Sequence, residues 1–338
     1  MLAVVVTSCA ENPKDISIGE WEEQVIESFF CANYPNQPIQ SFGLVSNDGG
    51  YILEHPPGTG GATPQIGDFV KFDMVGKLLN GNKFKVTTKR EAELLFTPST
   101  YLYATHYVPV YDSLGSTAIP AGVADMLQNM CAGDSVVILL PSVRAYGEKS
   151  YSQSGYTTTV PANTPVIFGL VLREVIPNPK EYELQKIADY RSTHTGFVEV
   201  YENDTAKIPV PLKGIYIKYV DTLAVTDTTP LPQKDTVLYL KYTGYYLDGF
   251  VLDTNIDSIA RAQLKSSFTV QSKYSTTFSH TLGSGTTTTI AAFDAALRKL
   301  TKGSTVEFIF TSDWGYGQYG NTNVQPYTPL RFRVYREK

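Results

Sequence analysis

The sequence predicts an α+β protein built from two similar units, each a curved antiparallel β-sheet wrapped on a short central α-helix. Three observations lead to this prediction. The length of 338 residues suits about two domains. Apolar and polar residues alternate at the period of strands along much of the chain. Short motifs recur in the same order in both halves, as an internal duplication produces.

The composition excludes several classes of protein. With 42% hydrophobic residues, the chain can form ordinary cores and is not an intrinsically disordered polymer. Its net charge of -5 argues against nucleic acid as a partner, because such binding needs a basic face. No apolar run approaches the roughly 20 residues of a membrane span. The four histidines and three cysteines form no metal-binding motif, so we expect no metal and no other cofactor.

Four motifs show the duplication, each recurring about 165 residues further along the chain. The pairs are 21–26 with 182–187, 67–72 with 234–239, 144–147 with 314–317, and 165–168 with 329–332. Their spacings differ by only a few residues, as loop insertions would cause. The chain is therefore interpreted as a tandem of two homologous units.

Each unit is expected to begin with a short amphipathic helix, over 20–31 and 180–191, that leads into the strands. The dipeptides Asn80-Gly81 and Asp248-Gly249 predict hairpin turns in which both central residues have positive φ. The residues expected to share a strand face are Val70, Phe72 and Met74 in the first unit and Leu238, Leu240 and Tyr242 in the second.

One central helix is predicted inside each unit, ended by Gly133 in the first and by Gly303 in the second. Further strands are predicted over 134–141, 166–175, 304–311 and 329–336. The apolar faces of the two helices consist of Val123, Met126, Leu127 and Met130, and of Phe293, Leu297 and Leu300.

These elements divide the chain into five predicted segments. They are a signal-peptide or lipobox remnant over 1–9, a lead-in helix and loop over 10–47, the first unit over 48–177, a helical lead-in and linker over 178–213, and the second unit over 214–338. The linker itself is expected in the Pro- and Thr-rich stretch 203–213.

The first nine residues resemble the end of a bacterial lipoprotein signal. Leu2 to Val6 form an apolar run, and Val6-Thr7-Ser8-Cys9 resembles a lipobox, although a basic region before it is missing. This resemblance implies an exported protein that is lipid-anchored at Cys9 on the periplasmic or surface side of a bacterial membrane. The alternative is a short buried strand. Cys31 and Cys131 are expected as free buried thiols rather than as a disulfide pair.

The ordered motifs resemble the FKBP-type peptidyl-prolyl cis-trans isomerases. The series runs Gly-Asp-x-Val, then Gly-x-Leu-x-Asn/Asp-Gly, then Ala-Tyr-Gly, then Val-Pro-x-Asn-x-Pro-Val-Ile-Phe, and it covers about 50–175 and 214–338. The resemblance implies a sheet wrapped on a helix with an aromatic pocket between them. It also implies proline-containing peptides or unfolded exported proteins as partners.

The reaction implied by this family needs few charged groups. Rotation about an X-Pro bond must cross a barrier of about 18–20 kcal/mol that amide resonance creates. A dry aromatic pocket disfavours the polar planar amide relative to the twisted one, in which resonance is lost. About 5–6 kcal/mol of such differential stabilisation corresponds to roughly 10⁴-fold acceleration. We therefore expect a cluster of aromatic residues with one carboxylate, and no nucleophile.

The resemblance places a nearly complete site in the second unit. Its catalytic positions are matched by Tyr242, Asp253 and Tyr316. Its substrate-binding positions are matched by Leu252, Phe278, Phe293, Val324 and Phe332, with Leu252 in place of a phenylalanine and Phe293 in place of a tryptophan. His280 lies in a strand pattern, where no partner is expected for it.

The first unit departs further from the family pattern. Its tyrosine position is Met74, its carboxylate position is Lys85, and its pocket floor aligns best with Val123. The matching pocket residues are Phe84, Tyr146, Val160 and Phe168. The insertion 91–117 contains Tyr101, Tyr103, Tyr107 and Tyr111, which could refill or cover the pocket.

Three functions stay open after this reasoning. The first is an isomerase whose activity lies mainly in the second unit. The second is a peptide-binding, chaperone-like lipoprotein without turnover, which the degenerate first unit favours. A structural envelope lipoprotein that reuses only the fold is a third.

Overall fold

The computed structural model describes residues 16–47, 49–56, 58, 60–95, 106–153, 156–202, 210–221, 231–264, 271–283, 290–298 and 300–337, with the backbone alone at 200–202, 210–213, 264 and 275. The chain forms two compact units. The first comprises Met1–Leu95 and Tyr107–Val175, and the second comprises Phe96–His106 and Ile176–Lys338. The five predicted segment boundaries stay a prediction.

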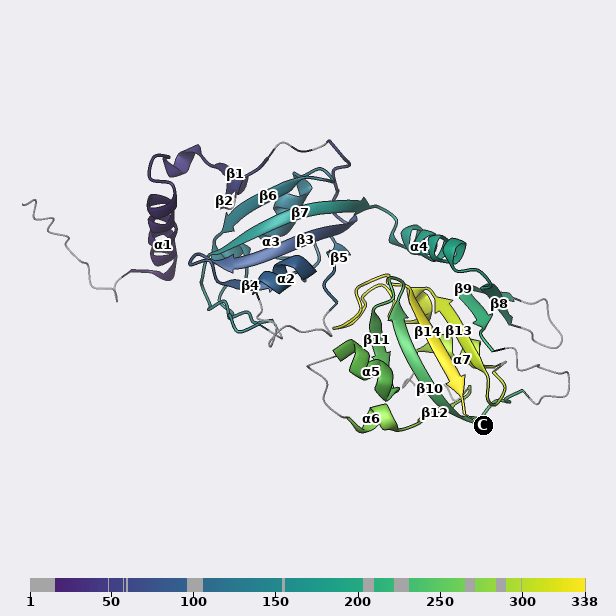
Figure 1. Cartoon of the computed structure of the whole chain (residues 1–338). Helices are drawn as coiled ribbons and strands as arrows, with labels where there is room; N and C mark the ends of the chain where they lie inside the picture. The colour runs from purple at the N-terminus through teal and green to yellow at the C-terminus, as the bar shows by residue number, and fades with distance from the viewer. Residues whose placement is uncertain are drawn as a thin grey trace, which may run out of the picture. The chain divides into compact units, whose positions relative to one another are not determined.

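The first unit contains one sheet in the strand order β1-β2-β6-β7-β3-β4, with β5 paired to β3 (Figure 1). Its strands are β1 (Gly43–Ser46), β2 (Gly49–Glu54), β3 (Phe69–Leu78), β4 (Lys83–Val86), β5 (Val110–Ser113), β6 (Ser135–Leu140) and β7 (Val166–Ile176). Its helices are α1 (Ile18–Asn33), α2 (Lys89–Leu95) and α3 (Ala121–Gln128), with single 3-10 turns η1 (Ile39–Ser41) and η2 (Ser142–Arg144).

The second unit repeats this order of strands as β8-β9-β13-β14-β10-β11, with β12 paired to β10. Its strands are β8 (Val198–Glu202), β9 (Val210–Tyr219), β10 (Val237–Tyr246), β11 (Val251–Thr254), β12 (Phe278–Thr281), β13 (Thr305–Phe310) and β14 (Leu330–Arg336). Its helices are α4 (Pro179–Thr193), α5 (Asp257–Leu264), α6 (Ser272–Ser275) and α7 (Ala291–Leu297), with the 3-10 turn η4 (Ser312–Trp314).

The matching strand orders confirm the predicted α+β fold and its duplication. Every strand pairing given for the described residues is antiparallel. Lead-in helix, central helix and 3-10 turn occupy the same places in the sequence of strands in both units. An element of one unit can therefore be compared directly with its counterpart in the other.

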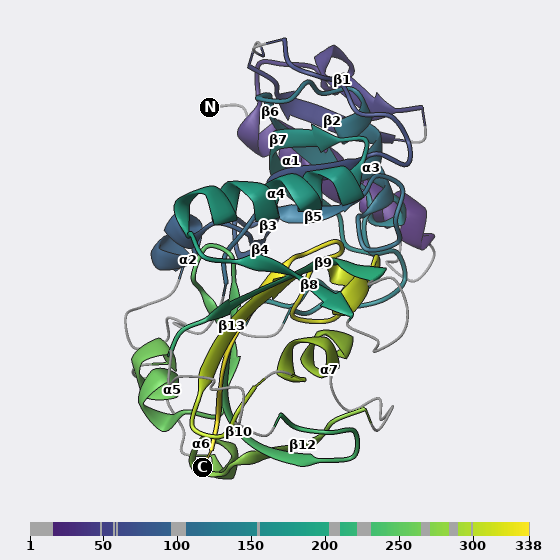
Figure 2. The same ribbon diagram turned by 90° about the vertical axis from the view of Figure 1, so that its right-hand side faces the viewer.

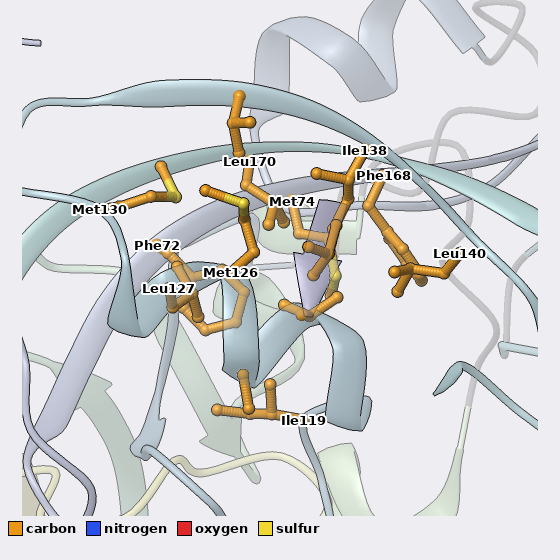
Figure 3. Packing of buried hydrophobic residues seen from close by; sticks show 14 of the residues in the cluster. Phe72, Met74, Ile119, Met126, Leu127, Met130, Ile138, Leu140, Phe168 and Leu170 are labelled. Carbon is orange, nitrogen blue, oxygen red and sulfur yellow. The ribbon is translucent and has the colours of Figure 1, made fainter. Parts of the chain in front are cut away.

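The central helix packs on one face of each sheet. In the first unit, Met126 and Leu127 of α3 pack against Phe72 and Met74 of β3, and all four are buried (Figure 3). In the second unit, α7 lies beside the strands of its sheet (Figure 2) and contributes Phe293 to the core. The predicted strand faces and helix faces are thus confirmed as core surfaces.

The lead-in helix packs on the opposite face of each sheet. Leu139 of β6 contacts Ile26 and Phe30 of α1, whereas its neighbours Ile138 and Leu140 belong to the central core. Ile309 of β13 contacts Ile187 of α4 in the same way. Because successive strand residues point to opposite faces, each sheet is covered on both sides.

Capping side chains fix where the lead-in helices begin. Ser17 and Glu20 form a reciprocal capping box at the start of α1. The Asn178 side chain accepts a hydrogen bond from the Glu181 backbone at the start of α4, and Pro179 follows at the first helical position.

Two local predictions differ from the structure. Strand β9 begins at Val210, so residues 210–213 are strand where we expected linker, and 203–209 lie outside the described residues. Gly133 and Gly303 do not end the central helices. They lie five or six residues beyond them, in turns that open β6 and β13, where positive φ values of 99° and 75° require glycine.

The hairpin turns lie where predicted, with a different backbone. In the second unit, Gly249 donates to the Tyr246 carbonyl at 3.0 Å, and the Tyr246 amide donates to the Phe250 carbonyl at 2.9 Å. Gly249 has positive φ and Asp248 does not. This is a type I turn with a bulge at glycine, which needs one left-handed residue rather than two.

No helix in the described part of the chain is long and apolar enough to cross a membrane.

Candidate active site

The strand pair β10–β11 brings a tyrosine and a carboxylate of the second unit together. Gly244 pairs with Asp253 across the two strands. The Tyr242 hydroxyl donates to Asp253 Oδ2 at 2.7 Å. Lys273 of α6 donates from Nζ to Asp253 Oδ1 at 2.9 Å. The carboxylate thus holds a hydroxyl on one oxygen and an ammonium on the other.

Asn255 fixes the backbone of this tyrosine. Its Oδ1 accepts from the Tyr242 amide at 2.7 Å, and its Nδ2 donates to the Leu240 and Thr276 carbonyls. The side chain is 3% exposed, and all three bonds satisfy groups that would otherwise be costly to bury. Asn255 therefore ties β10 to the segments after β11 and before β12.

Aromatic rings form the floor of the site. Phe293 of α7 lies 5.2 Å from Phe332 and 5.5 Å from Phe308 between ring centroids, edge to face in both cases. Tyr242 lies 6.3 Å from Phe293 and 5.5 Å from Phe278. Edge-to-face contacts of this kind are favoured by the quadrupoles of the rings, and the packed rings exclude water. Val324 is buried in the same cluster, and the half-buried Leu252 packs against this cluster.

Tyr316 follows the turn η4 and faces the carboxylate side of this cluster. Burial raises its pKa, and the negative charge of Asp253 raises it further. The same two causes, with the hydrogen bond to Asp253, raise the pKa of Tyr242 strongly. Both hydroxyls therefore stay protonated well above neutral pH and act as hydrogen-bond donors.

The structure thus brings together all eight residues that we assigned to the site of the second unit. Its chemistry is that of an apolar, aromatic surface edged by two hydroxyl donors and one carboxylate. Within the described residues, no three histidine, cysteine or acidic side chains are placed to hold a metal ion.

Two further residues near the floor have positions that the sequence did not predict. His280 is buried and its Nε2 lies 2.8 Å from Asp294 Oδ1 on α7, so the expectation that it lacks a partner is wrong. A partner on a helix 14 residues away is invisible in a strand pattern. Trp314 packs half-buried against the core of the second unit.

The corresponding site of the first unit is filled by side chains. Phe84, Val160 and Phe168 are fully buried. The ring of Tyr146 stacks on Tyr151 at 4.1 Å with 14° between planes, and Phe84 lies 5.9 Å from Tyr151. Burial raises the pKa of Tyr146 strongly. Tyr151 therefore packs directly on the tyrosine of this site.

Strand register confirms the alignment of the altered positions. Gly76 pairs with Lys85 in the first unit as Gly244 pairs with Asp253 in the second. Met74 is buried in the core and offers no hydroxyl. Lys85 is half-buried, and this desolvation lowers its pKa. Val123 holds the third position of α3, as Phe293 does in α7.

The tyrosines of the insertion have varied positions. Tyr101 and Tyr103 lie outside the described residues, as does Cys9. Tyr111 packs on Phe69 at 5.3 Å, on the β3–β5 pair. The residue that refills the pocket is Tyr151 instead, which sequence reasoning missed because an isolated β-bridge to Val160 places it there.

Lys273 was also missed, since the helix α6 that carries it has no strong pattern. The cysteines Cys31 and Cys131 are both free, as expected. Cys31 is exposed and Cys131 is only partly buried, so the expected burial of the two thiols is wrong.

Comparison with known families identifies both units. The model of the FKBP-type peptidyl-prolyl cis-trans isomerase family matches residues 60–173 and 229–335, together well over half of the chain. Human peptidyl-prolyl cis-trans isomerase FKBP10 is 32% identical over 117 residues, which are 35% of this chain and 16% of that protein. The mouse protein of the same name is also 32% identical over 117 residues, with the same coverage. The chain thus aligns with less than a fifth of the length of these relatives.

Solved structures give a weaker likeness. The three FKBP domains of wheat FKBP73 match at 16% identity and a TM-score of 0.30, over 88% of this chain and 98% of that one. FkpA from Escherichia coli matches at 18% identity and a TM-score of 0.33, over 47% of this chain and 63% of that one.

Proposed function

Because the chain belongs to the FKBP-type peptidyl-prolyl cis-trans isomerase family, we propose that it isomerises X-Pro bonds and that the second unit carries the activity. One observation supports this assignment above all others. The hydroxyls of Tyr242 and Tyr316 and the Asp253 carboxylate edge an aromatic surface in the second unit, whereas Tyr151 and Phe84 fill the equivalent site of the first.

The mechanism follows from differential stabilisation of the twisted amide. The planar X-Pro amide is polar because of resonance, and this resonance is lost when the bond rotates. The apolar floor of Phe293 and Phe332 therefore destabilises the planar amide more than the twisted amide. The Tyr316 hydroxyl is protonated at neutral pH, and it donates to the substrate carbonyl as the bond turns. The Asp253 carboxylate orients Tyr242 at the opposite edge.

Exchange NMR on an Ala-Leu-Pro-Phe peptide tests this proposal with the full chain. We expect faster cis–trans exchange with the wild type, and exchange about tenfold slower with Tyr316→Phe, since one hydrogen bond in the transition state is worth about 1.4 kcal/mol. The matched variant Tyr146→Phe removes the same hydroxyl from the filled site and leaves the rate unchanged. Equal losses with both variants would contradict the assignment to the second unit.

A second candidate is peptide binding without turnover. The first unit favours it, because Met74 and Lys85 stand there in place of the tyrosine and the carboxylate of the second unit. In the same NMR experiment, broadened peptide signals without faster exchange would support this candidate against the isomerase.

The location and clients of the protein are part of the proposal. The apolar run before Cys9 and the similarity of residues 6–9 to a lipobox support export and a lipid anchor. Clients are then exported proteins whose folding waits on X-Pro bonds, which take tens to hundreds of seconds uncatalysed. Mass spectrometry of the protein from its native membranes is expected to find a lipid-modified Cys9 as the first residue, and an unmodified residue there would refute the anchor.

A further inference from the structure

The lead-in helix of the second unit contributes one buried carboxylate to the turn that carries Tyr316. Glu183 of α4 is 2% exposed. Its Oε2 accepts from the Ser312 hydroxyl at 2.9 Å, and its Oε1 accepts from the Ser312 backbone amide. Ser312 is the first residue of η4, so the carboxylate caps this turn from another element.

The other side of Ser312 reaches Tyr316 directly. The Ser312 carbonyl accepts from the amides of Gly315 and Gly317, both at 2.8 Å. These two residues flank Tyr316 in sequence. A Cβ on Gly315 would lie 2.8 Å from the Phe310 ring, so this turn has little freedom to rearrange. Glu183, Ser312 and the backbone around Tyr316 therefore form one continuous chain of hydrogen bonds.

The first unit contains the same arrangement. Glu22 of α1 accepts from the Ser142 hydroxyl at 2.9 Å and from the Ser142 amide. The Ser142 carbonyl accepts from the Gly147 amide at 2.7 Å, next to Tyr146. The repeated acidic residue in motifs 21–26 and 182–187 thus has a physical reason. Both glutamates lie outside the segments that match the family model.

Burying a carboxylate at this position costs free energy of folding. Taking an ionised group out of water costs several kcal/mol, which an apolar residue would avoid. What the carboxylate adds is direction, because its two oxygens accept two donors of one residue at once. A fixed turn matters for catalysis, since a misplacement of about 1 Å in a reacting group can cost 10²-fold in rate.

We propose that Glu183 is a positioning residue of the isomerase site, which acts through Ser312 to hold the Tyr316 hydroxyl in place. The proposal rests on the proposed function of the second unit. It extends the site beyond the segment matched by the family model, to a helix that covers the opposite face of the sheet.

Conservative variants of the full chain test the rate. Glu183→Gln keeps the shape of the side chain but offers one acceptor oxygen, and its amide group faces a donor. We expect it to lower kcat/KM for the Ala-Leu-Pro-Phe peptide about tenfold with the peptide affinity nearly unchanged. Ser312→Ala is expected to lower kcat/KM similarly. Ser312→Thr keeps a hydroxyl and is expected to keep the wild-type rate. The matched control Glu22→Gln breaks the same link in the filled unit and leaves the rate unchanged.

A double-mutant cycle separates positioning from general structural damage. If Glu183 acts through Tyr316, Glu183→Gln lowers the rate no further in a chain that already carries Tyr316→Phe. Equal losses in both backgrounds would overturn the proposal, because the effect would then bypass the tyrosine.

Amide hydrogen exchange gives a readout that needs no activity. We expect the Gly315 and Gly317 amides to exchange at least tenfold faster in Glu183→Gln and Ser312→Ala than in the wild type, with strands β13 and β14 unchanged. Unchanged exchange at both glycines would overturn the proposal. A wild-type chain without isomerase activity would refute the proposed function instead, and the exchange data would still decide whether Glu183 fixes the turn.

Discussion

At the scale of residues, the two units differ by a coupled exchange at one pair of positions. Tyr242 and Asp253 are hydrogen-bonded in the second unit, and Met74 and Lys85 replace them in the first. A methionine cannot donate to a carboxylate, so loss of the tyrosine removes the bond that orients the acid. Lys85 then stands half-buried with a lowered pKa where the second unit has an anion. The first unit therefore has neither partner of the hydrogen bond that joins Tyr242 to Asp253.

Glu183 predicts a dependence of stability on pH. Burial raises its pKa to about 7, above the ordinary 4.5, although the bonds from Ser312 and the charge of Lys180 lower it and that of Asp313 raises it. Between about pH 4.5 and pH 7, the folded chain therefore holds a proton that the unfolded chain releases. We expect the free energy of unfolding of the second unit to fall as pH rises through this window, by about 3 kcal/mol at most.

Urea unfolding between pH 4 and pH 8 measures this slope. Glu183→Gln has no proton to bind and is expected to remove this contribution to it. Glu181→Gln, which changes a carboxyl on the exposed side of the same helix, serves as the control and keeps the slope. A steep slope that survives in Glu183→Gln would show that another group causes it. The ionisation that costs stability also supplies the acceptor for both donors of Ser312.

At the scale of elements, periodicity predicted what lies in the cores. The alternation of Val70, Phe72 and Met74 sufficed for β3, because each of these side chains is buried on the same sheet face. The helix faces were equally visible. Asn-Gly and Asp-Gly predicted where the hairpins lie. They did not predict the backbone conformation of the turns, because one sequence fits both a two-residue turn and a bulged one.

The missed parts of the site depend on contacts distant in sequence. Lys273 reaches Asp253 from 20 residues further along the chain, and His280 contacts Asp294 across the core. Tyr151 fills the first pocket through an isolated bridge. No local sequence pattern predicts such long-range contacts. The duplication could have identified Glu22 and Glu183, because a charged residue repeated at one place in two lead-in helices is a signal of a shared buried partner.

At the scale of the whole molecule, the chain is two units with separate cores. The first core gathers α3 with β3, β6 and β7, and the second gathers α7 with β10, β13 and β14. No residue belongs to both clusters. Each unit also covers its own sheet with its own lead-in helix. A small domain with its own core generally unfolds as one cooperative step.

We therefore expect two separable unfolding steps in calorimetry of the full chain. Met126→Ala in α3 and Leu297→Ala in α7 each remove a side chain that is at most 2% exposed, at a cost of about 2–5 kcal/mol. The first variant should lower the midpoint of one step and the second that of the other. A single transition shifted by both variants would show that the two units unfold as one. Two independent steps would mean that the first unit stays folded whether or not the second unit is intact.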